Sequence, residues 1–88
     1  MVKIKSKEEA ETQYVPGADF ADRNLWDDAI DRFREARDLD PTDARPHCGL
    51  GIAFHAKGNL EKAILWYSHA IRLDPKLGEA LYNRARAY

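Results

Sequence analysis

Four side chains in the middle of the chain are of types that can ligate a metal or act as nucleophiles: His47, Cys48, His55 and His69. A tetrahedral zinc site needs about four such ligands close together. On a helix, Cys48 and His55 would share one face but stand two turns apart. This spacing argues against a metal site. The same separation, with no third group to orient the imidazole, argues against a Cys–His nucleophilic pair.

Two other patterns could suggest chemistry and are better explained by structure. Gly49-Leu50-Gly51 resembles the start of a phosphate-binding loop, but Phe54 stands where the third glycine would be and no strand precedes the loop. The acidic pairs, such as Asp27-Asp28, are adjacent in sequence and would point to different faces of a helix. We therefore expect no catalytic site, no cofactor and no enzymatic activity.

Charge and composition limit the partners. The chain of 88 residues has 14 basic and 15 acidic side chains, so it lacks the basic character typical of nucleic-acid binding. Aromatic residues could form a stacking platform for bases, but without a basic groove this possibility is weak. The single cysteine fits a reducing compartment. No apolar run approaches the roughly 20 residues of a membrane span, and the N-terminus lacks the apolar segment of a signal peptide. We expect a cytoplasmic protein, or a soluble domain of a larger one, that does not insert into membranes.

The chain is organised by an internal repeat. The tripeptide Leu39-Asp40-Pro41 recurs at residues 73–75, an offset of 34 residues. At the same offset, other small and aromatic residues coincide, including Gly17 with Gly51 and Ala29 with Ala63. Phe33 is replaced by Tyr67, another aromatic residue. These residue types typically occupy packing positions, so the period predicts pairs of packed helices.

The repeat resembles the tetratricopeptide repeat (TPR), whose pattern is W-x2-L-G-x2-Y, then A-x3-F, then P, with a period of 34 residues. The central unit reads His47-x2-Leu50-Gly51-x2-Phe54, then Ala63-x3-Tyr67, then Pro75. Only the tryptophan position departs, since His47 fills it. The first unit lacks the tryptophan and leucine, and a third unit begins at Gly78 and covers only a first helix.

This resemblance implies an all-α fold, a right-handed α-solenoid of antiparallel helix pairs with about two and a half TPR units. We predict a charged tail at residues 1–9, either frayed or a loose helical turn, repeat one at 10–43, repeat two at 44–77 and the first helix of an incomplete third repeat at 78–88. Five helices are expected, at about 10–23, 26–39, 44–57, 60–73 and from 76 or 77 to 88. Pro16 should shorten the first helix, so that it starts near this residue, or else kink a longer one. Thr42 or Asp43 can cap the third helix.

In the TPR family, the first helix of each unit lines a concave groove. Carrying this over position by position gives the candidate peptide-binding or protein-binding residues Tyr14, Ala18, Arg45, Cys48, Ile52, His55, Tyr82, Asn83 and Arg86, with Gly49, Ala56 and Glu79 beside them. Within this set, Arg45, Asn83 and Arg86 could hold a carboxylate or a backbone carbonyl. Some members, Tyr82 above all, could instead pack against neighbouring helices. The resemblance implies an adaptor or scaffold that binds a protein or peptide in this groove.

Two further expectations concern the partner. One TPR subgroup clamps the C-terminal carboxylate of heat-shock chaperones with Lys, Asn and Arg. The corresponding positions here hold Tyr14, Ala18, Gly49, Glu79 and Asn83, so we expect no binding of that type. An alternative function is homo-oligomerisation, because Leu81 and Tyr88 would lack a covering helix. The charge distribution, −4 over residues 1–42 and +3 over residues 43–88, favours a head-to-tail contact only weakly.

Overall fold

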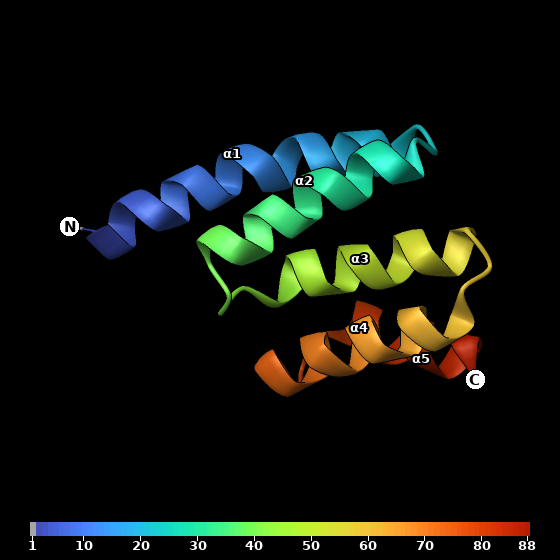
Figure 1. The fold of residues 1–88 in the computed structure, drawn as a ribbon. Helices are drawn as coiled ribbons and strands as arrows, with labels where there is room; N and C mark the ends of the chain where they lie inside the picture. The colour runs from blue at the N-terminus through green and yellow to red at the C-terminus, as the bar shows by residue number, and fades with distance from the viewer. Residues whose placement is uncertain (1) are drawn as a thin grey trace.

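Residues 2–88 fold into five helices that stack in sequence order (Figure 1). The structure is a computed structural model that describes the backbone of residues 2–88 and the side chains of residues 7–88. No strand occurs within those limits, which confirms the all-α prediction. The helices are α1 (Val2–Asp22), α2 (Trp26–Leu39), α3 (Ala44–Ala56), α4 (Leu60–Leu73) and α5 (Gly78–Ala87).

The second helices of the two repeats have the predicted bounds. Each buries one apolar face, with Ala29, Phe33 and Ala36 on α2 and Ala63, Tyr67 and Ala70 on α4. Aspartates 27 and 28 lie in the first turn of α2, where negative charge interacts favourably with the helix dipole. Each helix ends at the leucine before an Asp-Pro pair, because a proline disfavours helical geometry at the residue that precedes it.

The turn between the two helices of a repeat is also repeated. Asn24 and Gly58, 34 residues apart, both have positive φ angles, 62° and 85°. The next amide in each turn donates back to the first helix, from Leu25 to the Phe20 carbonyl and from Asn59 to the Phe54 carbonyl, at 2.9 Å in both cases. These are the hydrogen bonds of a Schellman motif, which needs a residue that tolerates the left-handed conformation.

The prediction for the first helix is wrong in its preferred form. Helix α1 runs without interruption from Val2 to Asp22 with Pro16 inside it, so the longer helix is correct and residues 2–9 are helical. Contacts upstream of Pro16 explain why the helix continues: Ala10 is buried, and Gln13 accepts a hydrogen bond from Arg32 of α2 at 2.9 Å. These contacts compensate for the hydrogen bond that the proline cannot donate. Residue 1 lies outside the described part of the chain.

Glycines set how closely the helices approach. A Cβ atom on Gly51 would lie 2.5 Å from the ring of Tyr67, and one on Gly17 would lie 2.9 Å from the ring of Phe33. The other side of Phe33 is covered by the next repeat, where a Cβ on Gly49 would lie 2.6 Å from the ring. Each aromatic ring therefore fits only because the facing residue has no side chain, as predicted for Gly51.

The remaining helix ends follow the predictions closely. Asp43, one of the two candidates, caps α3: its carboxylate accepts from the backbone N–H of Arg45 at 2.9 Å. Helix α3 ends at Ala56 rather than Lys57, and α5 ends one residue before Tyr88. Within the described residues, no helix combines the length and the apolar character needed to cross a bilayer.

Candidate interaction groove

The first helices of the three units lie side by side. Helix α3 contacts both α1 and α5, in addition to the contacts between helices that are consecutive along the chain. This arrangement places positions 34 residues apart on one continuous face. Two hollows lie on this face and meet at Ile52, which lines both of them.

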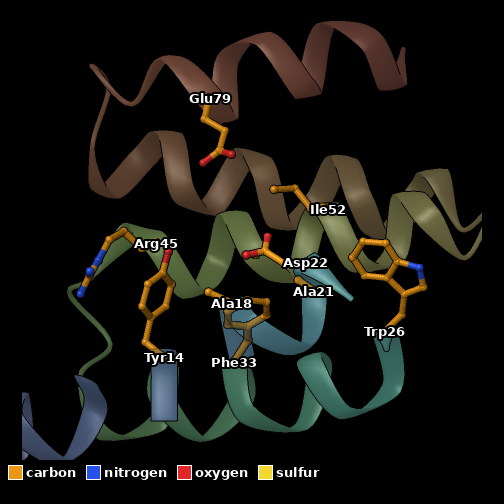
Figure 2. Close-up of a pocket in the computed structure, with 10 residues that line it drawn as sticks. Tyr14, Ala18, Ala21, Asp22, Trp26, Phe33, Arg45, Ile52 and Glu79 are labelled. Carbon is orange, nitrogen blue, oxygen red and sulfur yellow. The ribbon is translucent and has the colours of Figure 1, made fainter. Parts of the chain in front are cut away.

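The larger hollow, of about 370 Å³, lies between α1, α3 and α5, and we call it the acidic cavity. Figure 2 shows Glu79 extending from α5 toward the space that is flanked by Tyr14, Asp22 and Ile52. The walls are mostly apolar or aromatic and the charged groups are few. The lining residues are Tyr14, Ala18, Ala21, Asp22, Trp26, Phe33, Arg45, Gly49, Ile52 and Glu79.

Arg45 is already occupied by residues of the protein itself. Its guanidinium contacts Glu11 at 2.6 Å and Asp43 at 2.7 Å, and it lies over the ring of Tyr14 at 4.3 Å from the ring centre. Hydrogen bonds to Asp43 and then to Glu11 hold the Arg45 pKa above its ordinary value. Burial alone would raise the pKa of Asp43, but hydrogen bonds from Arg45 bring it below its ordinary value. A ligand carboxylate that binds Arg45 would therefore have to compete with Glu11 and Asp43 for the guanidinium.

The carboxylates of Glu79 and Asp22 have no such cationic partner. Among the side chains of residues 7–88, Glu79 is contacted by the thiol of Cys48, with Sγ 3.9 Å from the carboxylate oxygen, and neither carboxylate forms an ion pair. Burial, and then the charge of Glu79, raise the pKa of Cys48 to about 12. The thiol is therefore protonated at neutral pH, so it can donate weakly to Glu79 and is a poor nucleophile.

The smaller hollow, of about 240 Å³, lies between α3, α4 and α5, and we call it the basic cavity. It is lined by Ile52, His55, Ala56, Tyr67, Asn83 and Arg86. His55 Nδ1 lies 3.3 Å from the hydroxyl of Tyr67, which holds the imidazole against the wall. Arg86 lies over the ring of Tyr82 at 5.6 Å and lacks an ion pair with the side chains of residues 7–88. Its guanidinium can therefore donate hydrogen bonds to a carboxylate or a carbonyl oxygen of a ligand.

Most of the predicted groove residues line one of these cavities. Cys48 and Tyr82 do not: Cys48 is 2% exposed and belongs to the core, whereas Tyr82 is 66% exposed and lies beside the groove. The sequence reasoning missed five lining residues: Ala21, Asp22, Trp26, Phe33 and Tyr67. Asp22 precedes the predicted groove residue Ala56 by 34 positions, so the repeat register could have identified it. Trp26 lies on a second helix, and no sequence signal places it at the groove.

No metal centre emerges from the histidines and the cysteine. Within the described side chains, no group of three or more His, Cys, Asp or Glu residues is arranged to hold an ion. His47 is 6% exposed and packs on Trp66 and His69, with ring centres 5.7 and 5.9 Å apart. This position fits the expectation that His47 replaces the aromatic residue of the repeat pattern.

Sequence comparison identifies the family. The profile described as tetratricopeptide repeat matches residues 17–78, so the chain belongs to the tetratricopeptide repeat family. The chain is similar to Superkiller protein 3 of Saccharomyces cerevisiae, with 35% identity over 81% of this chain, and to Tetratricopeptide repeat protein 17 of Danio rerio, with 33% identity over 69% of it. It spans about 5% of the length of each of these relatives.

Solved structures agree on the fold. The TPR domain of Arabidopsis OM64 superposes with a TM-score of 0.89 at 23% identity, covering 93% of this chain and 68% of that domain. The second TPR of Spaghetti (RPAP3), solved with the HSP90 peptide SRMEEVD, has a TM-score of 0.89 at 22% identity and covers 94% and 77%. At these identities, the likeness concerns the fold and not the ligand.

Proposed function

We propose that this domain is an adaptor or scaffold module that binds a peptide or protein segment along the groove formed by α1, α3 and α5. The observation that carries the proposal is the pair of adjoining cavities with Ile52 between them. A bound segment would bury this partly exposed apolar side chain and meet charged groups on either side of it. Burial of an apolar anchor within a polar surround is how many groove-binding peptides are recognised.

A peptide selection tests this proposal directly. A random library of 12-residue peptides is displayed on phage and selected on the immobilised chain, and the enriched peptides are synthesised and titrated by fluorescence anisotropy. Ile52→Glu should weaken their binding at least tenfold, a loss of about 1.4 kcal/mol. Leu65→Glu is the matched control, because Leu65 is 52% exposed on α4 and lines neither cavity. Enriched peptides that bind the Ile52→Glu variant as tightly as the wild type would contradict the groove assignment.

The groove chemistry also argues against one class of ligand. An anionic chaperone tail would have to approach the unpaired Glu79 and Asp22, and the one arginine that lines the acidic cavity is occupied by Glu11 and Asp43. Like charges at short range disfavour binding. A peptide that ends in EEVD and contains no lysine or arginine therefore serves as a negative probe. We expect no saturable anisotropy change with this peptide, and micromolar affinity would contradict the expectation.

Self-association is a second candidate function, favoured by the surface of α5. Leu81 on α5 is 40% exposed, and Tyr88, directly after α5, is 82% exposed. In a longer array the next helix covers such a face. A second copy could cover this face instead. Sedimentation velocity over a range of concentrations, at low and high salt, tests the idea. Association that Leu81→Gln weakens would support it, and a monomer at every concentration would eliminate it.

A further inference from the structure

Resting on the proposed function, we infer that the peptide bound in this groove places a lysine or arginine side chain in the acidic cavity. The argument starts from the charges that line the cavity. Glu79 and Asp22 are carboxylates without a cationic partner among the side chains of residues 7–88, and Arg45 is bound by two other acidic groups. The cavity therefore has an excess of negative charge that a bound cation would compensate.

Asp22 increases this negative potential by its position, whereas Glu79 lies in the first turn of α5, where the positive end of the helix dipole favours its charged form. Asp22 is the last residue of α1, where the negative end of the helix dipole lies. Glu79 is contacted by the nearly fully buried Cys48 thiol, which orients the carboxylate without neutralising it. Both carboxylates belong to exposed residues, so a single ion pair with either of them contributes modestly, and packing of the ligand's aliphatic atoms on the apolar walls adds to it. The walls here include Ile52, Phe33 and other apolar side chains (Figure 2).

The shape of the cavity suits a long basic side chain. Its volume of about 370 Å³ exceeds what one such side chain fills, and Trp26 lines it on the side opposite to Tyr14 (Figure 2). The aliphatic part of lysine or arginine can pack against apolar walls while the charged end reaches a carboxylate. A guanidinium can also stack on an indole ring. An acidic side chain would lack a cationic partner here.

The distance between the two cavities predicts how far apart two charged residues of the ligand should be. Glu79 and Arg86 are seven residues apart on α5, which corresponds to about 10 Å along a helix. An extended peptide covers that distance in about three residues. The favoured ligand therefore carries a basic residue for the acidic cavity and, about three positions away, an acidic side chain that pairs with Arg86.

The test uses peptides from the selection whose binding depends on Ile52. These peptides should be enriched in arginine or lysine. In the tightest of them, replacing the basic residue by an uncharged analogue, citrulline for arginine or norleucine for lysine, should weaken binding to the wild-type chain severalfold. The same replacement should have little effect on how tightly the peptide binds the Glu79→Gln variant or the Asp22→Asn variant. Glu35→Gln is the matched control, because Glu35 is exposed on α2 and lines neither cavity.

The outcomes separate this inference from the proposed function. Ile52-dependent peptides without basic residues, or an equal loss in the wild type and in both carboxylate variants, would overturn the basic-residue preference and leave the groove assignment intact. The absence of any Ile52-dependent peptide would overturn both. Circular dichroism of each variant confirms that the helices are retained. Glu79→Arg provides a second check, because it should shift the selected peptides toward acidic residues.

Discussion

At the scale of single residues, the fold depends on glycines that face aromatic rings. Gly51 is buried against Tyr67, and a Cβ atom at this position would approach two ring carbons to 2.5 Å. The ring is fully buried, so it cannot move aside without disturbing the core. A single methyl group here therefore forces a displacement between α3 and α4.

Gly51→Ala should lower the free energy of unfolding by about 1–3 kcal/mol, the range expected for overpacking a core. Urea denaturation followed by circular dichroism measures the change. Gly78→Ala is the matched control, because a Cβ at Gly78 has no described neighbour within 4 Å. The control should be neutral or stabilising by about 0.4–1 kcal/mol. Equal effects of the two substitutions would contradict the packing argument.

A second residue-scale feature is the buried imidazole of His47. Neither ring nitrogen has a hydrogen-bond partner among the described residues. Burial, and then the neighbouring His69, lower the pKa of His47. In the unfolded chain this histidine takes up a proton at higher pH than in the folded one. The folded state is therefore fully stabilised above the ordinary pKa of 6.5 and loses stability as the pH falls below it.

The wild-type chain should be less stable at about pH 5 than at about pH 8, because protonation of His47 favours the unfolded chain. His47→Phe keeps an aromatic ring, removes both unpartnered nitrogens and should reduce this difference. Urea denaturation at the two pH values measures it. His55→Gln, which alters a partly exposed histidine, is the control and should retain the difference. A pH dependence that His47→Phe leaves unchanged would assign the effect to other groups.

At the scale of helices, the sequence predicted α2 and α4 to the residue because periodic apolar positions and Asp-Pro endings agree there. Its preferred start for α1, near Pro16, was wrong, because the local preference of Pro16 conflicts with contacts to other helices. Burial of Ala10 and the bond between Gln13 and Arg32 favour a continuous helix. These contacts involve residues that are distant along the chain. Local sequence preferences do not include such contacts, so they predicted a break at the proline.

Like the helices, the groove could be predicted only in part from the sequence. The 34-residue register located most of the lining residues, because equivalent positions in successive first helices face the same side. It could not show that Cys48 is buried, nor that Arg45 is paired with Glu11 and Asp43. Pairing depends on which of several nearby acidic side chains is within reach of the guanidinium. Only the packed arrangement of α1 against α3 determines that choice.

Pro16 leads to a prediction at this scale. Replacing it by alanine restores a backbone N–H that can donate to the carbonyl of Thr12 and removes the ring that crowds this carbonyl. Pro16→Ala should therefore raise the free energy of unfolding, by up to about 3 kcal/mol. Thermal and urea denaturation measure the gain. Val15→Ala, at the adjacent exposed position, restores no hydrogen bond and should produce a smaller change. A loss of stability in Pro16→Ala would mean that the proline ring contributes packing.

At the scale of the whole molecule, the repeats share one core. A single cluster of buried residues extends from Ala29 on α2 to Ala87 on α5. Phe33 joins the repeats, because its ring lies against Gly17 of its own repeat and Gly49 of the next. Two exposed ion pairs also cross this boundary, Arg45 with Glu11 and Lys57 with Asp27. Neither repeat therefore has a core of its own.

The domain should consequently unfold as one cooperative unit, because each repeat depends on its neighbour for burial. The two tryptophans report on the two repeats: Trp26 lies at the start of α2 and Trp66 lies within α4. In Trp66→Phe, fluorescence follows the first repeat, and in Trp26→Phe it follows the second. Within each variant, the urea midpoint from fluorescence should coincide with that from circular dichroism. Non-coincident midpoints would show that the repeats unfold separately and that the Phe33 junction is weaker than its packing suggests.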